Sequence, residues 1–281
     1  MRFSSSLARL DPRRPRGFPQ LTVKVHFDVR RQPAEPPVGN TLMSKIAAIL
    51  PAAGLGTRMG AETPKQFLEL DGVPILVHSL RKIASCELVT EIIVATRGEE
   101  VKRLEERLRG ENFRQTLRVV KGGDTRQESV AAALKHIAEG TEIVLVHDAV
   151  RPFVTREQIA RVIEEARTYG AAILGIPAMD TVKEVKRASL PEDVALITMT
   201  IPRERVVLAQ TPQVFSTGIL KEAFARAEAD GINASDEAGL VERLGREVHV
   251  VLGSERNIKI TKPADLDLAK FYLEREKAHR A

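Results

Sequence analysis

Several residue types are scarce in this sequence of 281 residues, and each scarcity argues against a class of protein. Trp is absent and Tyr occurs twice, so few aromatic rings are available to stack on nucleic acid bases. Cys86 is the single cysteine, which excludes an internal disulfide and fits a reducing cytosol. No apolar run approaches the roughly 20 residues that a membrane-spanning helix needs. We therefore expect a cytoplasmic protein that binds neither nucleic acid nor membrane.

The net charge of +5 is unevenly placed. Residues 1–43 hold eight Lys or Arg and three acidic residues, so the whole basic excess lies there. The remaining residues are electrically balanced. A basic surface for nucleic acid is therefore not expected on the folded part of the chain.

Residues 1–42 are rich in Pro and Arg, show no sustained hydrophobic period and are expected to be mostly disordered. The segment could be an organelle transit peptide, which leaves plastid targeting open, or a disordered interaction tail. It could also come from an upstream start codon, with the protein beginning at Met43. We favour the last, because Met43 lies directly before the first predicted strand without a linker. The predicted organisation is a single domain over residues 43–281.

The most informative stretch is residues 46–65. Its first five residues are apolar and bounded by Pro and Gly, which predicts a strand buried on both faces of a parallel sheet. The loop that follows is built from small residues, so its backbone N–H groups can approach anionic oxygens closely. Arg58 and Lys65 add two cations to this loop. A backbone cradle with two cations suits a polyphosphate.

Other nucleotide-binding patterns fit this loop less well. The dinucleotide pattern Gly-x-Gly-x-x-Gly fails because the third glycine, Gly60, comes one place late. Arg97 ends the second strand and would suit only a phosphorylated dinucleotide. The Walker pattern fails because no Gly-Lys-Ser/Thr follows. A purely structural turn remains an alternative, although such turns rarely carry two cations.

Strand and helix patterns alternate along the chain. We expect strands at residues 46–50, 91–95, 117–120, 143–146, 171–176, 206–209 and 248–252. We expect helices at residues 74–84, 99–109, 125–138, 155–168, 217–229, 235–244 and 263–275. This order predicts an α/β, Rossmann-like fold with a mostly parallel sheet and helices on both faces. Ligands then bind at the carboxyl ends of strands near a switch in strand order.

The alternation breaks at about residues 177–203, where two alternating runs surround a polar turn. This pattern predicts a β-hairpin that projects from the domain as an arm. Its apolar residues would be an adhesive surface unless they were covered. We infer a homodimer in which a second subunit covers the arm.

Seven short motifs occur in order along the chain. They are AAGLGTRM at 52–59, PKQ at 64–66, GGDTR at 122–126, HDAVRP at 147–152, QTPQ at 210–213, SDE at 235–237 and NIK at 257–259. Together they resemble the 2-C-methyl-D-erythritol 4-phosphate cytidylyltransferases of the non-mevalonate isoprenoid pathway, over about residues 45–273. The first motif alone marks only the wider nucleotidyltransferase group. Val150 departs from the alanine that the family more often has.

The resemblance implies transfer of CMP from CTP to 2-C-methyl-D-erythritol 4-phosphate, which gives 4-diphosphocytidyl-2-C-methyl-D-erythritol and pyrophosphate. The attacking phosphate oxygen is already ionised at neutral pH, so positioning and cations are the expected means of catalysis. The resemblance implies that Arg58 and Lys65 stabilise the transition state. It also implies that Arg203 and Lys259 hold the acceptor phosphate in line. Mg²⁺ is expected to bridge the CTP phosphates, with no protein ligand assigned.

The resemblance also implies two sets of binding residues. The CTP set is Pro51, Ala52, Ala53, Gly54, Gly56, Gly123, Asp124, Ser129, Asp148 and Ala149. The acceptor set is Arg151, Thr211 and Ser235. Ser235 could equally cap the next helix, and Asp148 could be a plain turn residue. His147 is expected to be hydrogen-bonded structure rather than a catalyst.

Three rival functions stay open at this stage. A ribitol 5-phosphate cytidylyltransferase would share the front half of the chain. An NADP-dependent oxidoreductase would need the dinucleotide pattern that the loop fails to match. A nonenzymatic binding protein could keep the fold, although the presence of all four predicted catalytic cations argues against it.

Overall fold

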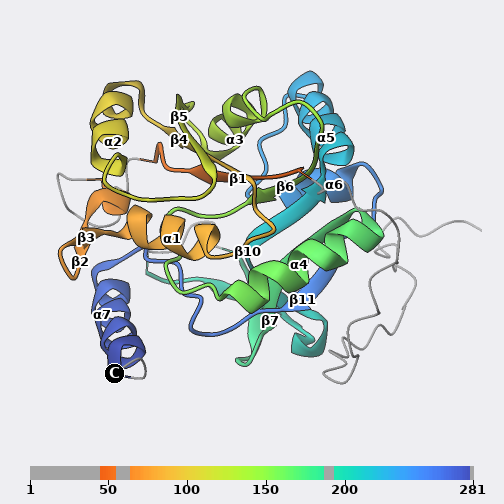
Figure 1. Ribbon diagram of the computed structural model, residues 1–281. Coiled ribbons are helices and arrows are strands. Elements are labelled where there is room, and N and C mark those ends of the chain that lie inside the picture. Colours follow the sequence, from red (N-terminus) through yellow and green to blue (C-terminus); the bar gives the residue numbers. More distant parts are fainter. Residues whose placement is uncertain (1–44, 55–63, 187–192, 279–281) are drawn as a thin grey trace, which may run out of the picture.

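The computed structural model of the protein describes residues 45–54, 64–186 and 193–278. Its centre is a seven-stranded sheet in the order β11-β7-β10-β6-β1-β4-β5 (Figure 1). The strands are β1 (Lys45–Pro51), β4 (Glu91–Thr96), β5 (Thr116–Lys121), β6 (Thr141–Val146), β7 (Ala171–Pro177), β10 (Val207–Ser216) and β11 (His249–Leu252). Only β10 runs antiparallel to its neighbours in this sheet. The predicted Rossmann-like, mostly parallel sheet is confirmed.

Helices cover both faces of the sheet (Figure 1). One face carries α1 (Ile75–Ala84), α2 (Val101–Leu108) and α4 (Arg156–Tyr169), and the other carries α3 (Arg126–Leu134), α5 (Thr217–Ala229) and α6 (Glu237–Arg243). Side chains alternate between the faces along a strand. In β1, Ile46, Ala48 and Leu50 pack in the first layer and Ile49 packs in the second. Burial on both faces explains why β1 is an unbroken apolar run.

Smaller elements complete the fold. The hairpin of β2 (Glu69–Leu70) and β3 (Val73–Pro74) packs with α7 (Pro263–Ala278) in a third apolar cluster. Its turn residues Asp71 and Gly72 have φ angles of 56° and 71°, as an Asp-Gly hairpin turn requires. The described residues also form the short 3₁₀-helices η2 (Lys65–Phe67), η3 (Gly98–Glu100) and η4 (Arg203–Arg205). The β2–β3 hairpin had not been predicted.

Two predicted elements differ from the structure. The helix expected to reach residue 138 ends at Leu134, because the N–H groups of Lys135 and His136 bond to carbonyl oxygens three residues back rather than four. The N–H of Ala138 then donates to the Glu91 carboxylate at 2.9 Å. The strand expected at residues 206–209 continues through the QTPQ motif to Ser216. The predicted caps at Thr125 and Thr155 are confirmed, and each forms a capping box.

The arm is a separate two-stranded sheet of β8 (Val182–Lys186) and β9 (Leu196–Ile201). Leu196, Ile197 and Met199 are between 50% and 62% exposed. The expected hairpin and its exposed apolar surface are therefore confirmed for the described residues. The predictions for residues 1–42 lie outside those residues.

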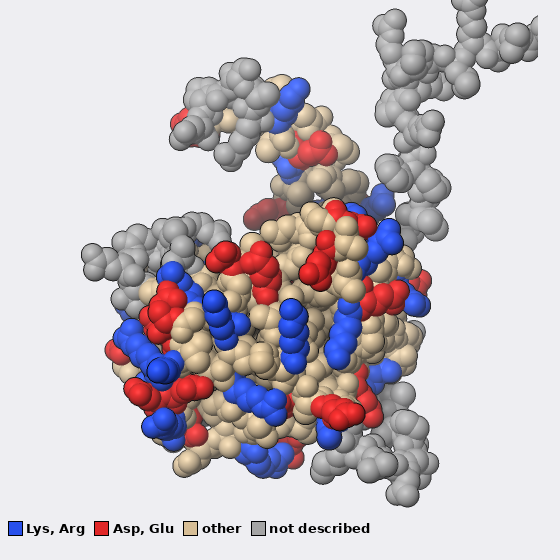
Figure 2. Space-filling view, turned by 90° about the horizontal axis from the view of Figure 1, so that it is seen from above, with Lys and Arg blue, Asp and Glu red and all other residues tan. Residues whose placement is uncertain are grey.

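The surface charge is mixed. Figure 2 shows Lys and Arg side chains interspersed with Asp and Glu on the face seen from above. Among the described residues, no helix combines the length and apolar character that crossing a membrane would require.

Candidate active site

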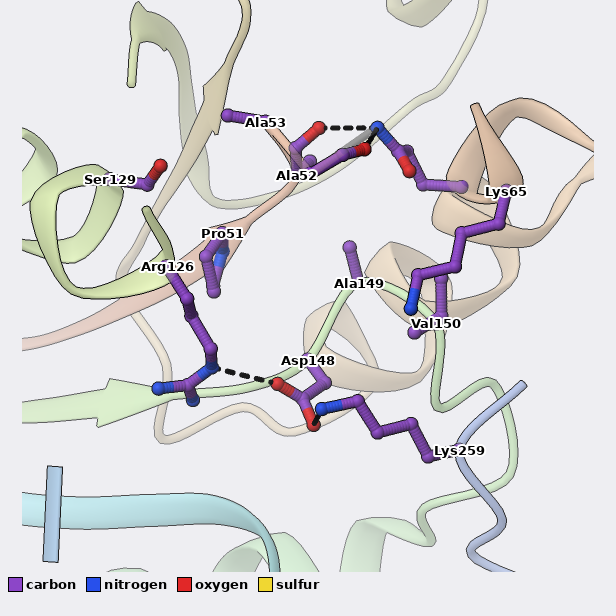
Figure 3. A pocket seen from close by; sticks show the side chains of 12 residues that line it. Pro51, Ala52, Ala53, Lys65, Arg126, Ser129, Asp148, Ala149, Val150 and Lys259 are labelled. Atoms are coloured by element: carbon purple, nitrogen blue, oxygen red, sulfur yellow. Dashed lines mark hydrogen bonds and ion pairs between the residues drawn. The ribbon is translucent and has the colours of Figure 1, made fainter. Parts of the chain in front are cut away.

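The strand order switches at β1. The strands that follow β1 in the sequence, β4 and β5, lie on one side of it, whereas β6 lies on its other side. The loops that leave β1 and β6 therefore run in opposite directions and leave space between them. A cavity of about 130 Å³ opens there, at the carboxyl ends of both strands (Figure 3). It is lined by Pro51, Ala52, Ala53, Gly54, Lys65, Gln66, Arg126, Ser129, Asp148, Ala149, Val150 and Lys259. The cavity lies where the fold class predicts a ligand.

Gln66 fixes the loop that leaves β1. Its side chain is 1% exposed, and its amide nitrogen donates to the carbonyl oxygens of Ala52 at 2.6 Å and Gly54 at 3.1 Å. The N–H of Ala52 donates to the carbonyl oxygen of Ala95 on β4 at 2.7 Å. Gln66 thereby occupies two carbonyl oxygens that would otherwise repel an anionic ligand.

The turn before α3 packs against its own helix cap. Thr125 Oγ1 accepts from the N–H of Glu128 at 3.1 Å, and the Glu128 carboxylate accepts from the N–H of Thr125 at 3.2 Å. A Cβ atom on Gly123 would lie 2.3 Å from Cβ of Glu128, so this turn requires glycine. Ser129 Oγ accepts from the N–H of Gly123 at 3.2 Å. Ser129 lies on the same side of the cavity as Ala53 (Figure 3).

Asp148 is the electrostatic centre of the cavity. Its Oδ1 lies 3.1 Å from Nε of Arg126, and its Oδ2 lies 3.0 Å from Nζ of Lys259 (Figure 3). The same Oδ2 lies 3.2 Å from Nε of Arg151. Burial alone would raise the pKa of Asp148, but the charges of Arg126, Lys259 and Arg151 outweigh it and hold that pKa well below its usual range. The carboxylate is therefore ionised at neutral pH and holds three cations at fixed positions.

A buried hydrogen-bond chain fixes the backbone of Asp148. Its N–H donates to Thr211 Oγ1 at 3.0 Å, and that hydroxyl lies 3.0 Å from Nδ1 of His147. Nε2 of His147 lies 3.0 Å from the carbonyl oxygen of Arg151, which can only accept. The ring proton is therefore on Nε2, and Thr211 donates to Nδ1. Burial lowers the pKa of His147 to about 4, so the ring is neutral at pH 7.

Arg126 connects Asp148 to a second buried carboxylate. Its Nη1 lies 2.6 Å from Oε1 of Glu237, the first residue of α6, which is 1% exposed. Burial opposes the charge on Arg126, but Glu237 and Asp148 outweigh it and raise the pKa of Arg126. Burial also raises the pKa of Glu237 above its ordinary value. Arg126 therefore stays charged between two carboxylates from different elements.

The cavity brings together most of the residues predicted from the motifs. Those that line it are Pro51, Ala52, Ala53, Gly54, Lys65, Ser129, Asp148, Ala149 and Lys259. Arg151 and Thr211 lie behind Asp148, with their side chains bonded internally. Gly123 shapes the adjoining turn, and Asp124 is exposed beside it. Arg58 and Gly56 fall outside the residues that the structure describes.

Arg203 and Ser235 do not line this cavity. Arg203 begins η4 at the base of the arm, is exposed, and donates from Nη1 to the carbonyl oxygen of Met179 at 2.7 Å. Ser235 is exposed and lies one residue before the N-cap of α6. That cap is Asp236, whose Oδ1 accepts from the N–H of Gly239 at 3.0 Å. The alternative of a cap at Ser235 is therefore wrong by one residue.

Three residues had been given no role by sequence reasoning. Gln66, Arg126 and Glu237 all fall within the seven motifs, so the signal that marked their neighbours also marked them. The motifs did not indicate that Arg126 contacts Glu237, because these two residues lie 111 positions apart in the sequence and come together only in the folded chain.

The sequence matches known proteins along nearly all of its described length. The family model of 2-C-methyl-D-erythritol 4-phosphate cytidylyltransferase matches residues 46–275. The protein of that name from Acidobacterium capsulatum is 52% identical over 235 residues, which are 82% of this chain and 97% of the relative. The protein of that name from Solibacter usitatus is 48% identical over 241 residues, which are 83% of this chain and 98% of the relative.

Solved structures give the same result. The crystal structure of 2-C-methyl-D-erythritol 4-phosphate cytidylyltransferase from Thermus thermophilus is 36% identical, with a TM-score of 0.65 and coverage of 81% of this chain and 98% of the other. A 4-diphosphocytidyl-2C-methyl-D-erythritol synthase from Anaerococcus prevotii is 30% identical, with a TM-score of 0.71 and coverage of 83% and 99%. The similarity therefore extends over almost the full length of these relatives.

Proposed function

The chain belongs to the 2-C-methyl-D-erythritol 4-phosphate cytidylyltransferase family, and from this premise we propose which of its residues carry out the reaction. The enzyme transfers CMP from CTP to 2-C-methyl-D-erythritol 4-phosphate and releases pyrophosphate, a step of isoprenoid synthesis. One observation carries the residue assignments. Lys65, Arg126 and Lys259 line a single cavity at the switch in strand order, and Asp148 in that cavity holds Arg126 and Lys259.

The chemistry requires cations more than proton transfer. The attacking group is a phosphate oxygen that is ionised at neutral pH, so no general base is needed. Two anions must approach each other, and charge grows on the α-phosphate and on the leaving pyrophosphate. Fixed positive charges and exact alignment lower such a barrier. The cavity meets this requirement because Asp148 holds its cations in place before any substrate arrives.

We assign transition-state stabilisation to Lys65 and to Arg58, which precedes Lys65 in the sequence. Lys259 holds the acceptor phosphate, since its ammonium lies at the cavity on the side away from α3 (Figure 3). The cytosine ring fits the opposite side, where Ala52, Ala53 and Ser129 are small and the turn at Gly123 and Asp124 offers backbone groups. Pro51, Gly54 and Ala149 also line the cavity and are proposed as further contacts to CTP.

The residues behind the cavity act through Asp148. Thr211 supports the Asp148 backbone, and Arg151 contacts the Asp148 carboxylate and the carbonyl oxygen of Asn257, at 2.7 Å from Nη1. We propose that these two contribute to acceptor binding by fixing the carboxylate and the segment that carries Lys259. Ser235 is proposed as an exposed contact at the α6 side of the acceptor site.

The donor set suits Mg²⁺ bound largely by substrate. Among the described residues no group of three or more His, Cys, Asp and Glu side chains could hold a metal ion. Asp148 is the acidic side chain in the described lining of the cavity. Both oxygens of this carboxylate are already paired with Arg126, Lys259 and Arg151. Mg²⁺ often relies on substrate phosphates for most of its ligands, so we propose that the CTP phosphates hold it. When bound, the ion would neutralise part of the phosphate charge.

We further propose a homodimer formed through the arm. The exposed apolar residues of β9 require a cover, and a second copy of the chain would supply one. Arg203 lies at the base of this arm and outside the cavity of its own chain. We therefore propose that Arg203 reaches the acceptor site of the partner subunit.

Mixing two inactive variants tests the proposed exchange. Lys65→Ala and Arg203→Ala subunits, each nearly inactive alone, should regain activity when dissociated and reassembled together, because some mixed dimers then contain one intact site. Activity that stays at the level of the separate variants would place both residues in the same subunit's site.

The substrate assignment is tested by pyrophosphate release from purified protein with CTP and Mg²⁺. 2-C-methyl-D-erythritol 4-phosphate should support release far better than ribitol 5-phosphate. The reverse preference would keep the nucleotide site and contradict the acceptor. Release with neither substrate would contradict the proposed roles of Lys259 and Arg203.

A further inference from the structure

Glu237 is a buried carboxylate that the proposed mechanism does not use. It is 1% exposed at the start of α6, on the side of the sheet that carries α3 and α5. Its Oε1 lies 2.6 Å from Nη1 of Arg126, and its Oε2 is buried without a hydrogen-bond partner. A half-satisfied buried carboxylate is costly, and an apolar residue would usually stabilise the fold better at such a place. Its contact with Arg126 therefore calls for a role beyond stability.

Arg126 is held at two points by two different elements. Its Nη1 contacts Glu237 on α6, and its Nε contacts Asp148 after β6, at 2.6 and 3.1 Å. Two hydrogen bonds from one planar guanidinium fix its orientation as well as its position. Loss of either contact would leave the guanidinium free to rotate.

The restraint continues from Asp148 to the acceptor side of the cavity. The Asp148 carboxylate pairs with Arg126 through Oδ1 and with Lys259 through Oδ2, the latter at 3.0 Å (Figure 3). An unbroken series of charged contacts therefore runs from Glu237 through Arg126 and Asp148 to Lys259. This series connects the Lys259 ammonium to Glu237, a residue on α6 that does not line the cavity.

We propose that Glu237 is a positioning residue for cytidylyl transfer, which fixes Arg126 so that Arg126 and Asp148 together hold Lys259 in line for the acceptor phosphate. This inference rests on the proposed function of the cavity. Glu237 contributes in two ways, by aligning the site and by adding a negative charge near it, and these two effects can be measured separately. Neutralising Glu237 loosens the alignment, but it also removes a negative charge near a site that binds a polyphosphate. Turnover should therefore fall while CTP binding does not weaken.

The test compares Glu237→Gln with Glu242→Gln, the same change at an exposed position of the same helix. Glu237→Gln should lower kcat by about tenfold, since small misplacements of catalytic groups have effects of this order or larger. The Kd for CTP, measured by calorimetry without acceptor, should stay equal or become lower. Glu242→Gln should leave both constants unchanged.

Two further variants test the length of the side chain at residue 237 and the route through Arg126. Glu237→Asp keeps the charge but shortens the side chain by one methylene, so it should also lower kcat if the 2.6 Å contact matters. Arg126→Lys cannot reach both carboxylates at once. If Glu237 acts through Arg126, the double variant Glu237→Gln/Arg126→Lys should lose no more activity than Arg126→Lys alone.

Several outcomes would overturn the proposal. These are wild-type kcat in both Glu237→Gln and Glu237→Asp, a Kd for CTP that rises in parallel with the fall in kcat, or losses that multiply in the double variant. Failure of the proposed function looks different, because wild-type protein would then release no pyrophosphate with CTP and 2-C-methyl-D-erythritol 4-phosphate.

Discussion

Lys65 is the described residue on which the catalytic assignment depends most directly. It follows the loop after β1, and its side chain extends into the cavity toward Val150 (Figure 3). Lys65→Ala should lower kcat by a factor of ~10²–10³, the loss expected when one fixed charge no longer stabilises the transition state. Pyrophosphate release at saturating CTP and acceptor measures it. Lys262→Ala, at an exposed lysine outside the cavity, is the control, and equal turnover in the two variants would remove Lys65 from catalysis.

His147 gives the free energy of unfolding a pH dependence of predictable sign. Its pKa is about 6.5 in an unfolded chain, and burial lowers it to about 4 in the fold. As the pH falls, the unfolded state therefore takes up this proton first, so stability decreases between about pH 6.5 and pH 4. This group alone should make the protein about 1–2 kcal/mol less stable at pH 5 than at pH 7, measured by urea unfolding.

Variants separate this contribution from those of other groups. The depressed pKa of Asp148 lowers the free energy of unfolding only at more acidic pH. The raised pKa of Glu237 has the opposite sign, because it increases the free energy of unfolding as the pH falls. His147→Gln should therefore lose much of the destabilisation between pH 7 and pH 5, whereas His136→Gln, at an exposed histidine, should keep it. The same pH dependence in both variants would rule out His147 as its source.

Residue identities could be predicted from the sequence, but side-chain partners could not. Asp148 and Lys259 were singled out by their motifs, and the structure brings them within 3.0 Å. The same motifs did not indicate that Thr211 supports the Asp148 backbone, or that Glu237 is the partner of Arg126. Such contacts join residues far apart in the chain, so they depend on strand order, which local patterns do not encode.

At the level of elements, β10 shows why one part of the fold could not be predicted. The strand was predicted to end at residue 209, and Pro212 lies beyond that point; proline cannot donate a hydrogen bond to a neighbouring strand. In the structure the pairing of β10 with β7 shifts between Ala209 and Gln213, and the pairing with β6 begins only at Gln213. Pro212 therefore lies where no ladder hydrogen bond is needed. The antiparallel strand also carries Thr211 to its place behind Asp148.

The arm is the element on which the proposed dimer depends. Ile197 and Met199 are 57% and 50% exposed on β9. The double variant Ile197→Asp/Met199→Asp should shift the protein from dimer to monomer, because two charges would have to be buried against the partner. Size-exclusion chromatography with light scattering measures the mass. Leu268→Asp, at an exposed apolar residue of α7, should remain dimeric, and a dimeric arm variant would contradict the proposal.

At the level of the whole molecule, the activity is expected to reside in residues 43–281. The family match covers residues 46–275, and the Acidobacterium capsulatum relative is covered over 97% of its length by 82% of this chain. Deleting residues 1–42 should therefore leave kcat unchanged and the melting temperature within a degree or so. Thermal unfolding and pyrophosphate release on both proteins measure this. A large loss in either would show that the extension contributes to the folded domain.

The segment that carries Lys259 has a consequence for how the protein folds. The carbonyl oxygen that holds Arg151 belongs to Asn257, 106 residues further along the chain. Contacts of such long range form late, because a large loop must close before they contribute any stability. A chain still growing on the ribosome would have the central strands β1, β4 and β6 long before it had the acceptor site. Turnover would then appear as one of the last properties to be acquired during folding, after the sheet is complete.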